Sequence, residues 1–296
     1  MKYMLLHCIN SDVDISPEAA AEMHRSMMAW LEDAIPRGVS LHGGKLQPPT
    51  TAATVRVRDG ALLVTDGPFA ETKEQVAGYD VIECADLDEA LEVVSRLPLG
   101  YGCIEVRPFR TAGEAMPRRE LGVVAWAEEI GRRHQAGEPD QAPPATTPPK
   151  RQETAANKFM MLVCVPEDWE QSSEEAAEAE RQMLPWLDDT INSGVSLHGG
   201  RLLPVSTATT VRAGKGELLV TDGPFAETKE HIAGYDVIEC ADRDQAIEIA
   251  SRHPVAGFGC IEVRQFEDSE QGMPRRRLEV AEWAQAMTRG GVAQRS

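Results

Sequence analysis

The sequence lacks the features that mark membrane-bound, disulfide-stabilised or nucleic-acid-binding chains. No apolar stretch approaches the roughly 20 residues that cross a bilayer, and the short N-terminal run MKYMLLHCIN predicts a strand rather than a signal peptide. None of the six cysteines forms a CxxC pair, which disfavours a disulfide framework or a zinc site and favours small buried side chains in a reducing compartment. Basic residues are few: 30 Lys and Arg against 48 Asp and Glu give a net charge of −18, without a local basic stripe. We therefore expect a cytoplasmic protein with neither nucleic-acid nor membrane partners.

Cofactor motifs are also missing. The sequence has no P-loop and no GxGxxG after a strand, so no nucleotide cofactor is expected. Neither Ser40 nor Ser196 lies in a nucleophile elbow, which disfavours a Ser–His–Asp hydrolase.

The strongest feature present is an internal repeat. The thirteen letters LLVTDGPFAETKE occupy residues 62–74 and return unchanged at residues 218–230. This spacing predicts two domains, 1–134 and 158–296, each ending in a helix, joined by a Pro/Ala/Thr-rich linker at 135–157.

Each copy has the same predicted order of elements. A strand is followed by a helix with Ser16 as N-cap and Pro17 at its first position. Then come a strand, a hairpin that turns at Asp59-Gly60, a strand, a helix capped by Asp86 and a last strand. This is the β-α-β-hairpin-β-α-β order of a ferredoxin-like α+β unit. Its sheet has helices on one face only, so the two copies are expected to pack sheet to sheet as an internal pseudo-dimer.

The string DGPFAETKE, together with SLHGGKL, GYDVIECAD and IEVRPF, resembles the YCII-related family in its DGPFAETKE branch, over residues 2–109 and 158–266. The resemblance implies a dimeric α+β barrel and a site in the cleft built around a His and an Asp. The residues that match this pair are His42 with Asp66, and His198 with Asp222. Members of the family are mostly uncharacterised, so the resemblance does not specify a reaction.

The strand GVSLHGG supplies the first candidate site residues. Strand alternation predicts that Val39 and Leu41 face the helices while Ser40 and His42 face the cleft. The two glycines after His42 should leave the backbone open to a small molecule. Three roles are open for His42: a hydrogen-bonded core residue, an acid–base or ligand-binding group, or a metal ligand. No second histidine lies at metal-binding spacing within a copy, so no metal is expected.

The strand CIEVR supplies the second set. Ile104 and Val106 should face the helices, and Cys103, Glu105 and Arg107 the cleft. Buried charges are costly unless they are paired. Either Glu105 and Arg107 satisfy each other, or Arg107 binds a carboxylate or phosphate of a ligand. The corresponding candidates in the second copy are Ser196, Glu262 and Arg264.

The repeated string itself has two interpretations. Asp66, Gly67 and Pro68 suit a demanding turn, and Phe69 suits a core gap. The polar letters AETKE suit the mouth of the cleft or a contact with the other copy. If there are ligand sites, there are two, related by pseudo-two-fold symmetry.

Two functions follow from these residues. The first is binding of a small molecule in the cleft, with isomerase- or lyase-like acid–base chemistry by His42 and Asp66. The second is a non-catalytic protein-interaction or regulatory module, and a higher homo-oligomer is open in either case. An interaction module should expose Phe69 or Tyr79, whereas an enzyme should hide them against a pocket. The sequence does not decide whether the chain is an enzyme.

Overall fold

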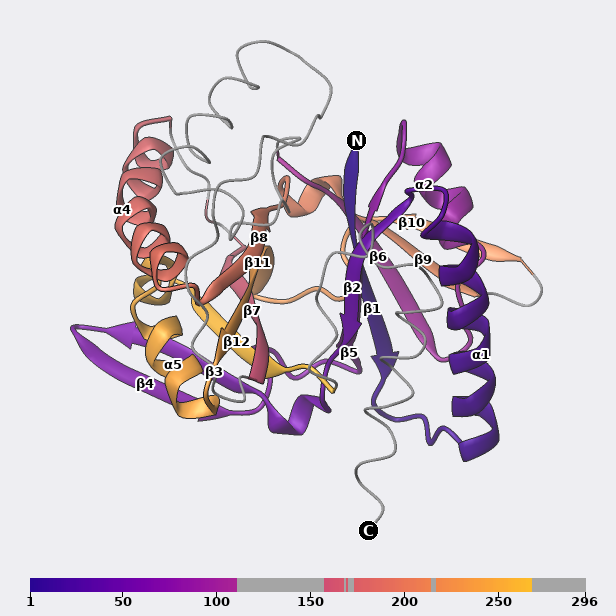
Figure 1. The fold of residues 1–296 in the computed structure, drawn as a ribbon, viewed down its shortest axis with the longest axis horizontal. Coiled ribbons are helices and arrows are strands. Elements are labelled where there is room, and N and C mark those ends of the chain that lie inside the picture. The colour runs from indigo at the N-terminus through magenta and orange to yellow at the C-terminus, as the bar shows by residue number, and fades with distance from the viewer. Residues whose placement is uncertain (111–156, 168, 170–172, 214–216, 268–296) are drawn as a thin grey trace.

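The computed structural model describes residues 1–110, 157–167, 169, 173–213 and 217–267, with no account of side chains at 173–180. Over these residues the chain forms two antiparallel six-stranded sheets with helices outside them (Figure 1). The α+β class and the duplicated order of elements are therefore confirmed. Residues 135–156 of the predicted linker and the two predicted terminal helices lie outside the described residues, and Asn157, predicted as the end of the linker, is the first residue of a strand.

The first sheet has the strand order β10-β9-β6-β1-β5-β2. Four of its strands come from the first repeat: β1 (Lys2–Asn10), β2 (Ser40–Lys45), β5 (Glu74–Glu83) and β6 (Gly102–Pro108). The second sheet has the order β4-β3-β12-β7-β11-β8. Four of its strands come from the second repeat: β7 (Asn157–Pro166), β8 (Ser196–Arg201), β11 (Glu230–Cys240) and β12 (Cys260–Gln265).

The remaining four strands are two hairpins that the repeats exchange. The first repeat's hairpin, β3 (Ala53–Arg58) and β4 (Ala61–Asp66), joins the second sheet through β12. The second repeat's hairpin, β9 (Thr209–Ala213) and β10 (Leu218–Asp222), joins the first sheet through β6. The sequence predicted these hairpins but not their exchange, because a strand pattern does not encode which sheet accepts the strand.

Backbone hydrogen bonds also join the other edges of the two sheets. Gln47 N–H donates to Gln265 O at 2.9 Å, where β2 meets β12. Leu203 N–H donates to Pro108 O at 2.9 Å, where β8 meets β6. The eight strands that are not part of the exchanged hairpins thus follow one another in a nearly closed ring. The two hairpins extend from this ring, and β4 and β10 are their outer strands.

Three hydrophobic clusters fill the fold. One contains side chains from both sheets, such as Met4, Leu6, Met160 and Leu162, all under 1% exposed. The other two lie between each sheet and its own helices. The exchanged hairpins enter them, since Val55 packs in the second repeat's cluster and Val211 in the first's. Each repeat therefore needs the other to complete its core.

The helices cover the outer faces of the sheets (Figure 1), and the two in the first repeat begin as predicted. The helices are α1 (Pro17–Ala34), α2 (Leu87–Val94), α4 (Ser173–Asn192) and α5 (Arg243–Ser251). Ser16 accepts a hydrogen bond from Ala19 N–H, and Asp86 accepts one from Glu89 N–H. Within the described part of the chain, no helix is long and apolar enough to cross a membrane.

The predicted direction of the Leu41 side chain is wrong. Val39, Ile104 and Val106 face the helices as expected, but Leu41 lies in the cluster shared by the two sheets. The register shifts between Ser40 and His42, because β2 has a bulge there. A bulge places two residues of one strand opposite one of its neighbour and breaks the alternation.

Candidate functional site

The DGPF loop of each repeat passes from one sheet to the other. In the first repeat it leaves β4, in the second sheet, and enters β5, in the first. Gly67 has φ 100° and its counterpart Gly223 has φ 102°, a left-handed conformation that glycine adopts without strain. The predicted turn is therefore present, and it also connects the two sheets.

Each loop is held by a buried ion pair of the opposite repeat. Phe69 N–H donates to Glu262 Oε2 at 2.9 Å, and Glu262 Oε1 accepts from Arg264 Nε at 2.9 Å. Arg264 also donates to the carbonyl oxygens of Gln47 and Val76, at 3.0 and 2.6 Å. One Glu–Arg pair thus holds three backbone positions of the other half.

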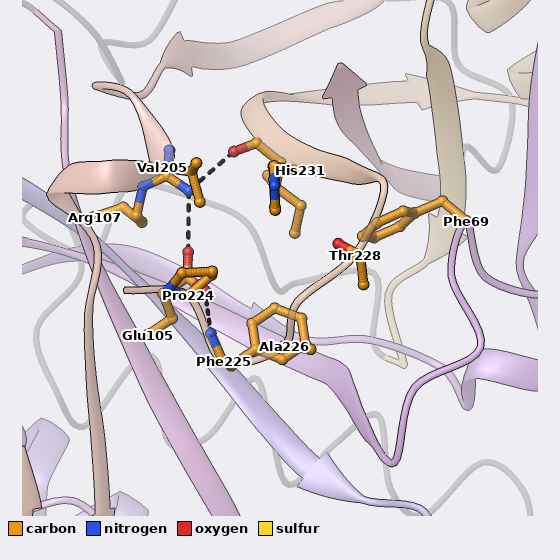
Figure 2. A pocket seen from close by; sticks show the side chains of 10 residues that line it. Phe69, Glu105, Arg107, Val205, Pro224, Phe225, Ala226, Thr228 and His231 are labelled. Atoms are coloured by element: carbon orange, nitrogen blue, oxygen red, sulfur yellow. Dashed lines mark hydrogen bonds and ion pairs between the residues drawn. The ribbon is translucent and has the colours of Figure 1, made fainter. Parts of the chain in front are cut away.

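The pseudo-symmetric pair does the same in reverse. Phe225 N–H donates to Glu105 Oε2 at 2.9 Å, and Arg107 Nη1 donates to Glu105 Oε1 at 3.0 Å. Arg107 Nη1 also donates to Ile232 O at 3.1 Å (Figure 2). Of the two roles left open for Arg107, the structure shows the ion pair, and both charges are 2% exposed or less.

The polar residues that follow DGPF add further contacts between the two repeats. Glu74 pairs with Arg212 of the second repeat's hairpin, and Glu230 pairs with Arg56 of the first's. The Thr72 hydroxyl donates to Glu74 O within its own loop. These contacts with the opposite repeat give a structural reason for the identity of the two strings.

The two candidate histidines meet where the sheets face each other. The ring centroids of His42 and His198 lie 4.2 Å apart, with the planes tilted by 46°. Each Nδ1 lies 3.2 Å from a tyrosine hydroxyl, Tyr79 for His42 and Tyr235 for His198. The histidines are only 2% and 1% exposed. The structure thus encloses His42 among aromatic side chains of both repeats.

The predicted partners of these histidines lie elsewhere. Asp66 is at the exposed end of β4 and pairs with Arg243 of α5 at 2.7 Å, while Asp222 is at the exposed end of β10. Two aspartates of β5 and β11 pair with other imidazoles: Asp80 with His7 at 2.9 Å and Asp236 with His253 at 3.7 Å. Ser40 and Ser196 are fully buried.

The backbone beside His42 is not open to a ligand, contrary to expectation. A Cβ placed on Gly43 would lie 2.2 Å from Asp80 Oδ1 and 2.5 Å from Tyr79 O. The glycine therefore permits close packing against β5. No group of three or more His, Cys, Asp or Glu side chains suited to a metal ion occurs in the part of the chain that is described.

Comparison with known proteins agrees with this architecture. The model of the YCII-related domain matches twice, at residues 1–111 and 160–269, which together make up most of the chain. The chain belongs to the YCII-related family. A 68-residue segment is 51% identical to the uncharacterized protein R00369 of Rhizobium meliloti (strain 1021), covering 22% of this chain and 55% of that protein. The family assignment carries no reaction with it.

A cleft of this YCII-related chain with room for a ligand lies beside the second DGPF loop. It has a volume of about 430 Å³ and opens between that loop and the segments after β7 and β8. Its lining residues are Glu167, Val205, Ser206, Pro224, Glu227, Thr228, Lys229 and His231. We call this the second-repeat cleft.

A smaller cavity lies behind the cleft, at the joint between the repeats. Its volume of about 10 Å³ suits one water molecule. Phe69 and Arg107 of the first repeat line it together with Phe225 and His231 of the second (Figure 2). Phe69 is half-buried and Tyr79 is 1% exposed. Neither side chain is exposed as an interaction module would require, but only Phe69 borders the cavity, since Tyr79 packs in the cluster shared by the two sheets.

His231 borders both spaces, and the sequence analysis missed it. Burial lowers the pKa of its imidazole; Glu167 opposes this effect and Arg107 adds to it. The ring is therefore neutral at pH 7 and can accept a proton. A signal for it was present: the two copies are identical through Glu74 and Glu230, and the next residue is Gln75 in one copy and His231 in the other.

Proposed function

We propose that this chain binds a small polar molecule in the second-repeat cleft, with His231 as the group that exchanges a proton with it. The volume of about 430 Å³ falls within the range of small-molecule sites, about 300–1,000 Å³. The hydroxyls of Ser206 and Thr228 and the charges of Glu227 and Lys229 supply polar contacts on the walls. This combination suits a ligand with several hydrogen-bonding groups.

The observation that carries the proposal is the position of His231. It is 8% exposed, lines the inner end of the cleft, and has its pKa lowered chiefly by burial. A neutral imidazole at the end of a cleft can take a proton from a bound molecule and return it elsewhere. The chemistry supported is an isomerase- or lyase-like proton transfer that needs no nucleotide.

His42 is less well placed for this role than His231. It is 2% exposed, and its ring lies between His198 and Tyr79. We assign the two central histidines to the joint between the sheets, where their bonds to Tyr79 and Tyr235 fix the packing.

A thermal-shift screen of small polar metabolites tests the proposal. A ligand present at about 100 times its dissociation constant stabilises the protein by about 2.7 kcal/mol. We expect hits with the wild type that are lost in His231→Gln and retained in His24→Gln, since His24 is exposed on α1. Hits that survive His231→Gln and disappear in the His42→Ala/His198→Ala variant would place the site at the central pair and refute the assignment.

The edge strands favour a second function, self-association. β4 and β10 are exposed along their whole length, and each carries consecutive apolar residues: Leu62, Leu63 and Val64, and Leu218, Leu219 and Val220, all 42–54% exposed. An unprotected apolar edge is a template for another strand. In antiparallel pairing about a two-fold axis, Leu63 of one β4 would face Val64 of a second copy, so the strand is self-complementary.

Light scattering after size exclusion tests this second function. We expect a concentration-dependent mass above 32.4 kDa that falls to the monomer value in Leu63→Lys/Leu219→Lys. Leu184→Lys, at another exposed apolar residue on α4, is the matched control and should behave as wild type. A wild type that stays monomeric at every concentration would rule the association out.

A further inference from the structure

The two DGPF loops have the same backbone bonding but differ in one side chain at their end. In both, a threonine hydroxyl donates to the carbonyl two residues on, Thr72 to Glu74 and Thr228 to Glu230. The residue that follows is Gln75 in the first repeat and His231 in the second, and the two are similarly buried, at 9% and 8% exposure. The difference therefore lies in what each side chain contacts.

Gln75 ties the first loop to itself. Its Nε2 donates to Ala70 O at 3.1 Å, to Thr72 O at 2.8 Å and lies 3.2 Å from the Thr72 hydroxyl. A second tie comes from the residue after β1: the Ser11 hydroxyl donates to Lys73 O at 3.1 Å. These bonds draw the loop onto the end of β5.

His231 makes no comparable tie. Within the described residues, its ring has no hydrogen bond to the loop it follows, and it borders the inner cavity and the cleft instead. The position that corresponds to Ser11 is Glu167. Its backbone N–H donates to Lys229 O at 2.9 Å, and the residue lines the cleft. At these two positions the second repeat has His231 in place of Gln75 and Glu167 in place of Ser11. The second loop therefore lacks the side-chain hydrogen bonds that Gln75 and Ser11 make in the first, and both residues border the cleft instead.

We propose that the chain carries one ligand site instead of two: the second repeat binds, and Gln75 closes the equivalent site of the first. This inference rests on the proposed function and deepens it. His231, as a neutral acceptor, selects a ligand that presents a hydrogen-bond donor at the inner end of the cleft, such as a hydroxyl or an ammonium group. The first repeat has no site of its own because Gln75 closes it, and it contributes Glu105, Arg107 and Phe69 to the wall of the small cavity behind the second-repeat cleft.

Residue exchange between the copies tests the inference without a known ligand. The probe is diethyl pyrocarbonate, which acylates accessible neutral imidazoles, applied to the full chain and read by peptide mass spectrometry. We expect His231, which borders the cleft, to react more slowly than exposed His24 but faster than His42 and His198, which are more deeply buried. In Gln75→His the introduced imidazole should react like His231, because the ties that close the loop are gone.

Thermal stability supplies the second measurement. His231→Gln should form the three bonds that Gln75 makes and raise the melting temperature by about 2–4 °C, the shift expected for roughly 1 kcal/mol in a chain of this size. Gln75→His should lower it by a similar amount. His24→Gln controls for the loss of an imidazole at an exposed position and should leave the melting temperature unchanged.

The outcomes separate this inference from the proposed function. If the introduced imidazole is protected, or if His231→Gln melts lower than wild type, the closing role of Gln75 is wrong even when library compounds bind. If the exchange behaves as expected but no compound in the screen binds the wild type, the asymmetry holds and the proposed function fails. If His231 reacts no faster than His42, both are wrong.

Discussion

Removing the carboxylate of Glu262 should destabilise the whole protein. This carboxylate has two partners, the Arg264 guanidinium and the Phe69 N–H, each at 2.9 Å. Glu262→Ala leaves a charge that is 1% exposed without a counter-charge, and it leaves a backbone donor of the opposite repeat unsatisfied. Both losses occur at the joint on which the exchanged hairpin depends.

The size of the effect follows from these two losses. Breaking a buried ion pair by deleting one partner costs about 3–5 kcal/mol, and an unsatisfied buried donor costs about 1–3 kcal/mol. The terms overlap, so we expect a loss of at least about 3 kcal/mol in the free energy of unfolding, a large fraction of the 5–15 kcal/mol typical of a folded domain. The exposed pair of Arg25 with Glu22, each 65% exposed, should contribute less than about 1 kcal/mol.

Urea unfolding of Glu262→Ala, Glu105→Ala and the control Glu22→Ala measures the difference. The first two should lose similar stability at an unchanged m-value, because the two pairs are pseudo-symmetric, and the control should stay near wild type. A double variant, Glu262→Met/Arg264→Met, should recover part of the loss, since no unpaired charge remains. A Glu262→Ala variant within about 1 kcal/mol of wild type would refute the view that these pairs hold the repeats together.

Three further predictions test other parts of the structure. A protease site inserted at 135–157 should leave the cleaved halves associated in size exclusion, because the repeats exchange hairpins; separation of the halves would argue against the exchange. Burial raises the pKa of Cys84 to about 11 and that of Cys240 to about 12, so iodoacetamide at pH 8 should label them slowly in the native state and quickly in urea, by mass spectrometry. Fast native labelling would contradict their burial. The lowered pKa of His231 means that the unfolded chain binds its proton more readily, so the stability of wild type relative to His231→Gln should fall as the pH drops below 6.5 in urea titrations, and a flat difference would show that the imidazole is exposed.

Much of the fold could be predicted from the sequence because the signals are local. Ser16 and Asp86 act as the caps they were expected to be, and the turn at Asp59-Gly60 has the positive φ values, 53° and 76°, of a tight hairpin. All six cysteines are free and buried, as their apolar surroundings indicated. A helix cap or a turn depends on a few neighbouring residues, so one sequence is enough to locate it.

The site was less predictable, because its contacts join residues far apart in the chain. Glu105 and Arg107 could be placed on one face of a strand, but the loop they hold belongs to residues more than a hundred positions away. His42 was correctly placed toward the other repeat, whereas Asp66 was expected beside it and pairs with Arg243 instead. Strand periodicity gives the direction of a side chain, not its partner.

The sequence by itself therefore determined the two repeats, the order and capping of their elements, the faces of most strand residues and the family. The tertiary structure decided which sheet each hairpin joins, which repeat each Glu–Arg pair holds, and that a cleft lies beside His231. The physical reason is the exchange of hairpins: it makes every loop of the repeated string cross to the other half. Only the packing of both halves then shows whether Gln75 or His231 leaves space for a ligand.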